Sequence, residues 1–367
     1  MSLAGVAQPN VKSPAARHGT PAASDGFTRG FTLLAVLLIS GAYLDTWAHH
    51  NLQAVNKEGF VTPWHALLYT TLLLIGTYLS TALYRNHRRG HAWREALPAG
   101  YGLSWVAMLA FALGGSLDAV WHYLFGIELS VAALVSPTHL LLMVAGGLIV
   151  SGPLRSATVS QARYAPWPAV VSATLILAMA TFFAQFDHPY LDRWALAPMD
   201  AGQGPDWMQE ELGLLGVLLQ AGMLTGVALL LLRRFELRFG SLTLLVGLSG
   251  TLVALVADHV EMVAAALLAG LAADLVYAAI RPVAADRVAF RAFAFALPAL
   301  VAAAYFLVLA LYGGIWWPIH FWAGAIPLAG GTGWLLSFLA LPARSEGLIL
   351  TVDAHSKPGF GGAGGRT

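Results

Sequence analysis

LDAVWHYLFGIELSVAALVSPTHLL, residues 117–141, joins two apolar stretches and places three polar side chains beside the connection. Asp118 and His122 lie near the end of the first stretch, and His139 lies near the start of the second. An apolar stretch of about 20 residues crosses a bilayer as a helix. The segment therefore predicts a helical hairpin in a membrane, with a carboxylate and two imidazoles gathered at its turn.

A second copy of this pattern occurs earlier in the chain. Residues 44–68 read LDTWAHHNLQAVNKEGFVTPWHALL, and Asp45 and His49 align there with Asp118 and His122. Residues with this spacing lie on one face of a helix, close enough for each aspartate to share an ion with its histidine. The chain therefore presents the same paired groups twice.

Both copies return to the membrane through the same local signal. Thr62 and Ser136 are each followed by a proline, and His65 and His139 come shortly after. A hydroxyl residue before a proline is typical of a helix N-terminus, where the hydroxyl caps the first turn. Each second histidine therefore falls in that first turn, level with the Asp and His of the preceding helix. The two predicted repeat hairpins span residues 30–84 and 99–154.

The composition is that of an integral membrane protein whose main partner is the lipid bilayer. Of the 367 residues, 58% are hydrophobic and only 11% are charged, whereas soluble domains carry about 25% charged residues. Cysteine is absent, which excludes disulfides and thiolate metal sites. The net charge of +1 gives no indication of nucleic-acid binding.

The apolar stretches predict an all-α polytopic membrane protein with about ten transmembrane helices. A polar tail precedes them at 1–29, the transmembrane domain covers 30–343, and a flexible tail follows at 344–367. The seventh and eighth helices share one apolar stretch, with a turn expected at 258–262. The ten predicted helices are 30–49, 62–84, 99–123, 135–154, 165–186, 208–232, 240–258, 261–281, 290–313 and 318–342.

The basic residues predict the orientation. With the N-terminus in the cytoplasm, all of the 20 lysines and arginines except Lys57 and Arg193 fall in cytoplasmic segments. Cytoplasmic loops of membrane proteins carry such an excess of positive charge. We therefore expect both termini in the cytoplasm, in the inner membrane of a bacterium-like cell, with the Asp/His/His groups facing the opposite side.

Further polar residues are expected on that opposite side or within the membrane. Polar groups at membrane depth are costly and are functional candidates. Asp274 falls inside the eighth predicted helix, where a functional carboxylate and a helix–helix hydrogen bond are both open interpretations. The additional candidate ligands at the outer ends of helices are His188, Asp258, His259 and His320.

Two imidazoles and a carboxylate form a metal-binding set. Such ligands suit copper, zinc and iron, and a catalytic metal keeps one coordination position open. The predicted ligands are Asp118, His122 and His139 in one group and Asp45, His49 and His65 in the other. The structural alternative is that each Asp–His pair only forms hydrogen bonds at a helix end.

Asp-x-x-Trp-His followed by Ser-Pro-x-His resembles the metal site of the C subunit of particulate methane and ammonia monooxygenases. In that family an Asp and a His on one membrane helix join a His from the next helix, and the metal is copper. The resemblance implies that Asp118, His122 and His139 bind copper, with Trp121 and Pro137 as flanking matches. The Asp45 copy matches less closely. The family subunit has fewer helices and works in a complex with other membrane subunits, which the resemblance also implies as partners.

Four functions are compatible with these observations. A copper-dependent oxidase or monooxygenase of a small apolar or lipid-soluble substrate agrees best with the ligand sets and the resemblance. A metal permease or delivery protein needs a polar path to the cytoplasm, which the inner halves of the helices lack apart from Asp274. Haem bound by two histidines agrees less well with the paired aspartates. The fourth alternative is a scaffold subunit without activity.

The orientation is testable because the chain has no native cysteine. Single cysteines replacing Lys57, Glu128, Asp200 or His320 should react with an impermeant thiol reagent added to intact cells. Cysteines replacing His87 or Arg234 should react only after the membrane is permeabilised. Labelling of position 87 from outside contradicts the predicted topology.

Overall fold

The computed structural model describes residues 19–52, 62–126, 131–160, 162–197 and 206–341. Within these residues the chain is helical, with two isolated β-bridges and no strands. The helices are α1 (Asp25–Asn51), α2 (Pro63–Arg88), η2 (Trp93–Glu95), α3 (Gly102–Phe125), α4 (Val131–Val135), α5 (Pro137–Val150), α6 (Gly152–Val159), α7 (Trp167–Phe183), η3 (Gln185–Asp187), α8 (Pro189–Asp192), α9 (Trp207–Leu232), η4 (Thr243–Leu248), α10 (Ser249–Val256), α11 (Val260–Ile280), α12 (Arg287–Tyr312) and α13 (Ile319–Ala340).

Eight of these helical segments have the length and apolarity of a bilayer span, which makes the chain an integral membrane protein. They are α1, α2, α3, α5 together with α6, α9, α11, α12 and α13. Two shorter apolar segments, α7 and the continuous η4–α10 segment, occupy the positions of the fifth and seventh predicted spans. The all-helical membrane class is confirmed, and the count of ten spans stays a prediction.

Three boundaries differ from those expected from the sequence. Helix α1 begins at Asp25 because the Ser24 side chain accepts the N–H of Phe27, so residues 25–29 are helical and do not belong to a tail. The predicted span 135–154 is interrupted at Ser151, where Pro153 starts the first turn of α6. A turn separates the seventh and eighth predicted spans, but it lies at residues 257–259 and not at 258–262, since α10 ends at Val256 and α11 begins at Val260. Residues 1–18 and 342–367 of the predicted tails lie outside the described part of the chain.

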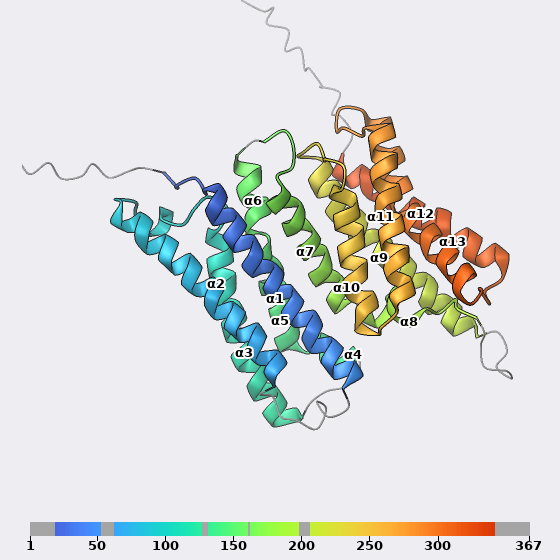
Figure 1. Ribbon diagram of the computed structural model, residues 1–367, viewed down its shortest axis with the longest axis horizontal. Helices are drawn as coiled ribbons and strands as arrows, with labels where there is room; N and C mark the ends of the chain where they lie inside the picture. The colour runs from blue at the N-terminus through green and yellow to red at the C-terminus, as the bar shows by residue number, and fades with distance from the viewer. Residues whose placement is uncertain (1–18, 53–61, 127–130, 161, 198–205, 342–367) are drawn as a thin grey trace, which may run out of the picture.

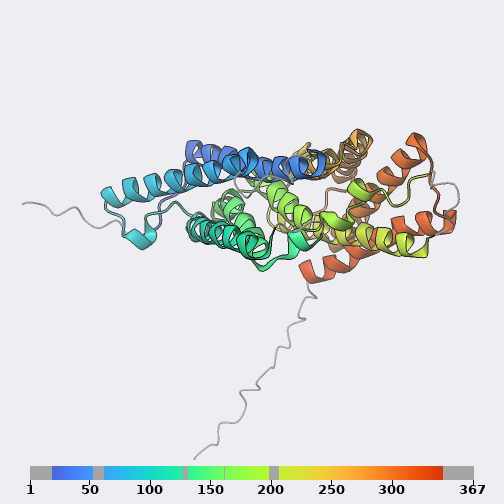
Figure 2. The same ribbon diagram turned by 90° about the horizontal axis from the view of Figure 1, so that it is seen from below.

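Helix α7 stands between the two halves of the bundle. Figure 1 shows α1, α2, α3 and α5 in one half and α9, α11, α12 and α13 in the other. Helix α7 packs against α1 and α5 on one side and against α9 and α10 on the other. Figure 2 shows the α1–α2 hairpin lying over the α3–α5 hairpin. The two copies of the sequence motif therefore face each other across the first half.

Basic residues gather at the end of the bundle away from the motif turns. At this end of the bundle, Arg155 Nε donates to the carbonyl of Gly100. The neighbouring N–H of Ala99 donates to the carbonyl of Pro21. Arg29 and Arg238 line one groove at the same end. Positive charge of this kind is typical of the cytoplasmic side of membrane proteins, and the orientation of this chain stays a prediction.

Of the two basic residues assigned to the opposite side, Arg193 pairs with Glu261 at 2.5 Å. Arg193 is an exception to the predicted distribution of basic residues, and the ion pair with Glu261 neutralises its charge. The other, Lys57, lies outside the described residues.

Asp274 is the most heavily hydrogen-bonded carboxylate described. It accepts the backbone N–H groups of Gly240, Leu242 and Thr243 and the hydroxyl of Thr243, at 2.6–3.2 Å. These donors belong to the start of the segment that continues into η4 and α10, where helical N–H groups have no partner within the helix. The geometry therefore supports the hydrogen-bonding interpretation of this intramembrane carboxylate.

We predict that Asp274→Ala lowers the free energy of unfolding by about 3 kcal/mol or more, because it leaves several buried donors without an acceptor. Asp286→Ala is the matched control, since Asp286 is exposed and caps α12 through Val288 and Ala289; its loss should cost about 1 kcal/mol. Denaturant titration of the purified protein in detergent measures both. An equal loss of unfolding free energy in the two variants would show that Asp274 contributes no more than an ordinary helix cap.

Candidate metal centre

Asp118, His122 and His139 converge at the turn between α3 and α5, and we call them the Asp118 triad. The Asp118 Oδ2 atom lies 3.4 Å from His122 Nε2, and Asp118 Oδ1 lies 3.4 Å from His139 Nδ1. One ligand atom from each residue lies within 4.8 Å of the other two. Asp118 is only 2% exposed, so its charge requires partners.

Asp45, His49 and His65 converge in the same way between α1 and α2, and we call them the Asp45 triad. The Asp45 Oδ2 atom lies 3.9 Å from His49 Nε2 and 3.6 Å from His65 Nε2. These ligand atoms also lie within 4.8 Å of one another. The structure thus brings together both ligand sets that the sequence indicated.

The predicted helix caps are present and also orient the histidines. The Thr62 hydroxyl accepts the N–H of His65 at 3.1 Å, and the Ser136 hydroxyl accepts the N–H of His139 at 3.3 Å. The same hydroxyls form hydrogen bonds with the imidazole Nδ1 atoms, at 3.1 Å and 2.7 Å respectively. Partners of this kind fix the ring orientation of metal-binding histidines.

Further hydrogen bonds hold the other groups of the Asp118 triad. Thr138 Oγ1 donates to Asp118 Oδ1 at 2.7 Å, and His122 Nδ1 lies 3.2 Å from the carbonyl oxygen of Gly126. The second bond turns His122 Nε2 toward Asp118. Each member of this triad therefore has a neighbour that sets its direction.

The spacing of the ligand atoms suits a metal ion. Two ligands about 2.1 Å from a tetrahedral metal stand about 3.4 Å apart. The Asp118–His122 pair has this separation, and the two Asp–His pairs of the Asp45 triad are slightly wider. Asp45 Oδ1 is buried and has no hydrogen-bond partner among the described residues. A buried carboxylate oxygen without a partner is costly, and a bound cation satisfies it.

Both triads open onto one cavity of about 80 Å³, which we call the triad cavity. Asp45 and His65 line it from one hairpin, and Asp118 and His139 line it from the other. The remaining wall is mostly apolar and includes Phe111, Leu142, Met179, Phe182 and Phe183. A small molecule in this space therefore lies between both ligand sets.

Tyr69 of α2 also lines the triad cavity, and sequence reasoning missed it. Its ring stacks against His65 with the ring centroids 6.3 Å apart. Gly115 of α3 makes room for this ring, because a Cβ atom at position 115 would lie 2.7 Å from a ring carbon of Tyr69. The signal was present in the sequence, since Tyr69 follows His65 by one helical turn and shares its face.

The other candidate ligands do not join either triad. His188 Nδ1 accepts the N–H of Tyr190, and His259 Nδ1 lies 3.0 Å from the carbonyl oxygen of Tyr190. Asp258 accepts the indole N–H of Trp47 at 3.2 Å. His320 is exposed in the first turn of α13. The structure gives the first three of these side chains hydrogen-bonding roles at helix ends.

Comparisons of the chain with protein-family models, with curated proteins and with solved structures find no match.

We predict that Thr138→Val weakens metal binding 10–100-fold, because it removes the hydrogen bond that orients Asp118. Thr71→Val is the matched control, since the hydroxyl of Thr71 donates only to the carbonyl of Leu67 in its own helix. Titration against a competing chelator measures the affinity of each variant. Equal effects of the two substitutions would contradict a role for Thr138 in holding Asp118.

Proposed function

We propose that the chain is a membrane metalloenzyme that binds one metal ion, preferentially copper, in each triad and acts as an oxidase or monooxygenase. The substrate is a small apolar or lipid-soluble molecule that binds in the triad cavity. The observation that carries this proposal is the single cavity onto which both Asp/His/His sets open. Imidazole-rich sites suit copper, iron and zinc, and the motif resemblance favours copper.

The walls of the triad cavity support an apolar substrate. Phe111, Phe182 and Phe183 cover the space beside the ligands and exclude bulk water. Bound copper would supply the redox chemistry that activates dioxygen. The protein's own groups bind and orient: Asp45 and Asp118 balance the metal charge, and Thr62 and Ser136 hold the imidazoles. The Tyr69 side chain brings a phenol to the same cavity.

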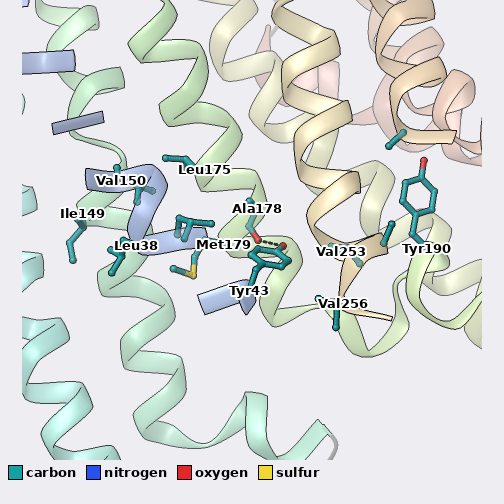
Figure 3. Close-up of a cluster of buried hydrophobic side chains, with 14 of the residues drawn as sticks. Leu38, Tyr43, Ile149, Val150, Leu175, Ala178, Met179, Tyr190, Val253 and Val256 are labelled. Carbon is teal, nitrogen blue, oxygen red and sulfur yellow. Dashed lines mark hydrogen bonds between the residues drawn. The ribbon is translucent and has the colours of Figure 1, made fainter. Parts of the chain in front are cut away.

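Transport of the metal through the bundle is the weaker alternative. A permease needs polar groups that continue from the site toward the other membrane face. Below the triads, the space between the helices is filled by buried apolar side chains such as Leu38, Ile75 and Ile149. Figure 3 shows Leu38, Ile149, Leu175 and Met179 in this packed layer. The described helices thus offer no polar route beneath the site.

Haem is also disfavoured as the bound group. Pockets for larger organic ligands measure about 300–1,000 Å³, whereas the triad cavity is about 80 Å³. A carboxylate lies between the histidines in each triad, which is the arrangement for a single ion and not for a flat macrocycle. The size and the ligand set therefore favour individual metal ions.

The proposal also includes the orientation of the bundle in the membrane. The basic end of the bundle faces the cytoplasm of a bacterium-like cell, and the triads face the opposite side of its inner membrane. Large apolar side chains of α3, including Leu109, Leu113 and Val120, are exposed and contact lipid or other membrane subunits.

The proposal predicts two bound ions per chain after reconstitution with copper. His122→Ala and His49→Ala should each lose one ion, since removing a direct ligand should cost at least the 10–100-fold typical of indirect partners. His320→Ala, at an exposed histidine outside both triads, should keep both. Metal analysis and an optical spectrum of the purified protein measure this.

Oxygen uptake with a short-chain hydrocarbon as probe tests the activity separately. Uptake should require bound copper and should fall in both triad variants. Unchanged metal content in His122→Ala contradicts the metal assignment, and an intense Soret band identifies haem instead. Bound copper without oxygen uptake contradicts only the enzymatic part of the proposal.

A further inference from the structure

A second cavity of about 60 Å³ lies on the other side of α7, in the half of the bundle without triads. Leu177 and Thr181 of α7 line it, whereas Met179, Phe182 and Phe183 line the triad cavity. Helices α8, α9, α10 and α12 close the remaining sides. We call it the α9 cavity.

Two buried polar atoms on residues of the α9 cavity have no hydrogen-bond partner in the part of the chain that the structure describes. They are Tyr190 Oη and Gln220 Nε2. Tyr190 is only 3% exposed, and buried polar atoms are nearly always hydrogen-bonded. Figure 3 shows Tyr190 among the buried side chains of the core. A molecule bound in the cavity would supply the missing partner.

His188 adds a third donor to the same wall. Its Nδ1 atom accepts the N–H of Tyr190, so the proton of the neutral ring is on Nε2. Burial lowers the pKa of His188 to about 3, which keeps the ring neutral. The phenol, the carboxamide and the imidazole all have hydrogen atoms to donate. A ligand that matches them carries an acceptor atom.

The α9 cavity selects against charge. Its described lining has no Asp, Glu, Lys or Arg, and most of it is apolar, as at Val217, Leu224 and Ala302. Its shape is built into the backbone. A Cβ atom at Gly250 would lie 2.8 Å from a ring carbon of Tyr190, so glycine lets α10 approach the ring. The π-helix η4 contributes Val246, and such helices are frequent at functional sites.

We propose that the α9 cavity binds a small uncharged organic molecule with one acceptor oxygen, of the class of short-chain ketones, aldehydes and alcohols. Its volume of about 60 Å³ limits the ligand to a few non-hydrogen atoms. The oxygen accepts from Tyr190 and Gln220, and the hydrocarbon part contacts Val217, Leu224 and Ala302. This binding does not depend on metal in the triads.

The test uses the absence of cysteine in the chain and a pair of probes of the same shape. Ala302→Cys places a thiol in the α9 cavity, and Ala173→Cys places one in a packed core cluster outside it. A small neutral methanethiosulfonate should modify the thiol of the purified Ala302→Cys chain and leave that of the Ala173→Cys chain unmodified. The acetone concentration that halves the rate of modification should be at least about fivefold lower than the isobutene concentration that does so. Isobutene has the same shape as acetone but lacks the oxygen.

Two tyrosine variants in the Ala302→Cys chain test the hydrogen bond. Tyr190→Phe should raise the acetone concentration needed for half protection about fivefold. Tyr101→Phe is the control, because Tyr101 is also a buried tyrosine but lies outside the α9 cavity.

Three results would overturn the proposal. The first is a thiol at position 302 that reacts no faster than the thiol at position 173. The second is equal protection by acetone and isobutene. The third is modification at position 302 without any protection, which means that the cavity holds only water.

Discussion

The Asp118 carboxylate lies 2% exposed inside a membrane protein, and its neighbours are arranged to offset that burial. An ionised carboxylate in such surroundings costs roughly several kcal/mol unless charges and hydrogen bonds satisfy it. Thr138 donates to it, and two imidazoles lie within 3.4 Å. Because these groups come from both α3 and α5, satisfying the carboxylate also fixes how the two helices meet at their turn. Ser136 also fixes this junction, because its hydroxyl caps α5 by accepting the backbone N–H of His139.

The α1–α2 hairpin repeats these local interactions and adds a contact with a distant segment of the chain. Thr62 caps α2 and holds His65 as Ser136 holds His139. Tyr69 then crosses to Gly115 of α3, where the missing side chain allows close approach. This contact, together with α7, encloses the space between the hairpins. Two ligand sets that are far apart in the chain therefore share one cavity, and a small molecule there is near both.

Helix α7 divides the interior into two chemically different spaces. On one side lie the two carboxylates and four imidazoles of the triads. On the other side, a neutral histidine, a phenol and a carboxamide line the α9 cavity. Neither face of α7 carries a charge, so the difference comes from the helices packed against it. One apolar helix therefore separates a space lined by carboxylates and imidazoles from one whose described lining has no charged residue.

The sequence alone determined the features that depend on neighbours in the chain. The helical segments followed from runs of apolar residues, the pairing of Asp118 with His122 and of Asp45 with His49 followed from helical spacing, and the caps at Thr62 and Ser136 followed from local chemistry. These interactions act over one helical turn, so their geometry is set as soon as the helix forms. The same reasoning predicted a turn between α10 and α11, although the structure places it at residues 257–259.

Only the tertiary structure decided the features that depend on which helices pack together. The sequence left the role of Asp274 open, because its donors come from a segment more than 30 positions away, as with Gly240. It did not show that the two triads share a cavity, or that Tyr190 and Gln220 face a second one. Packing between distant segments sets these contacts, and the apolar residues that drive packing carry no signal about the polar side chains they enclose.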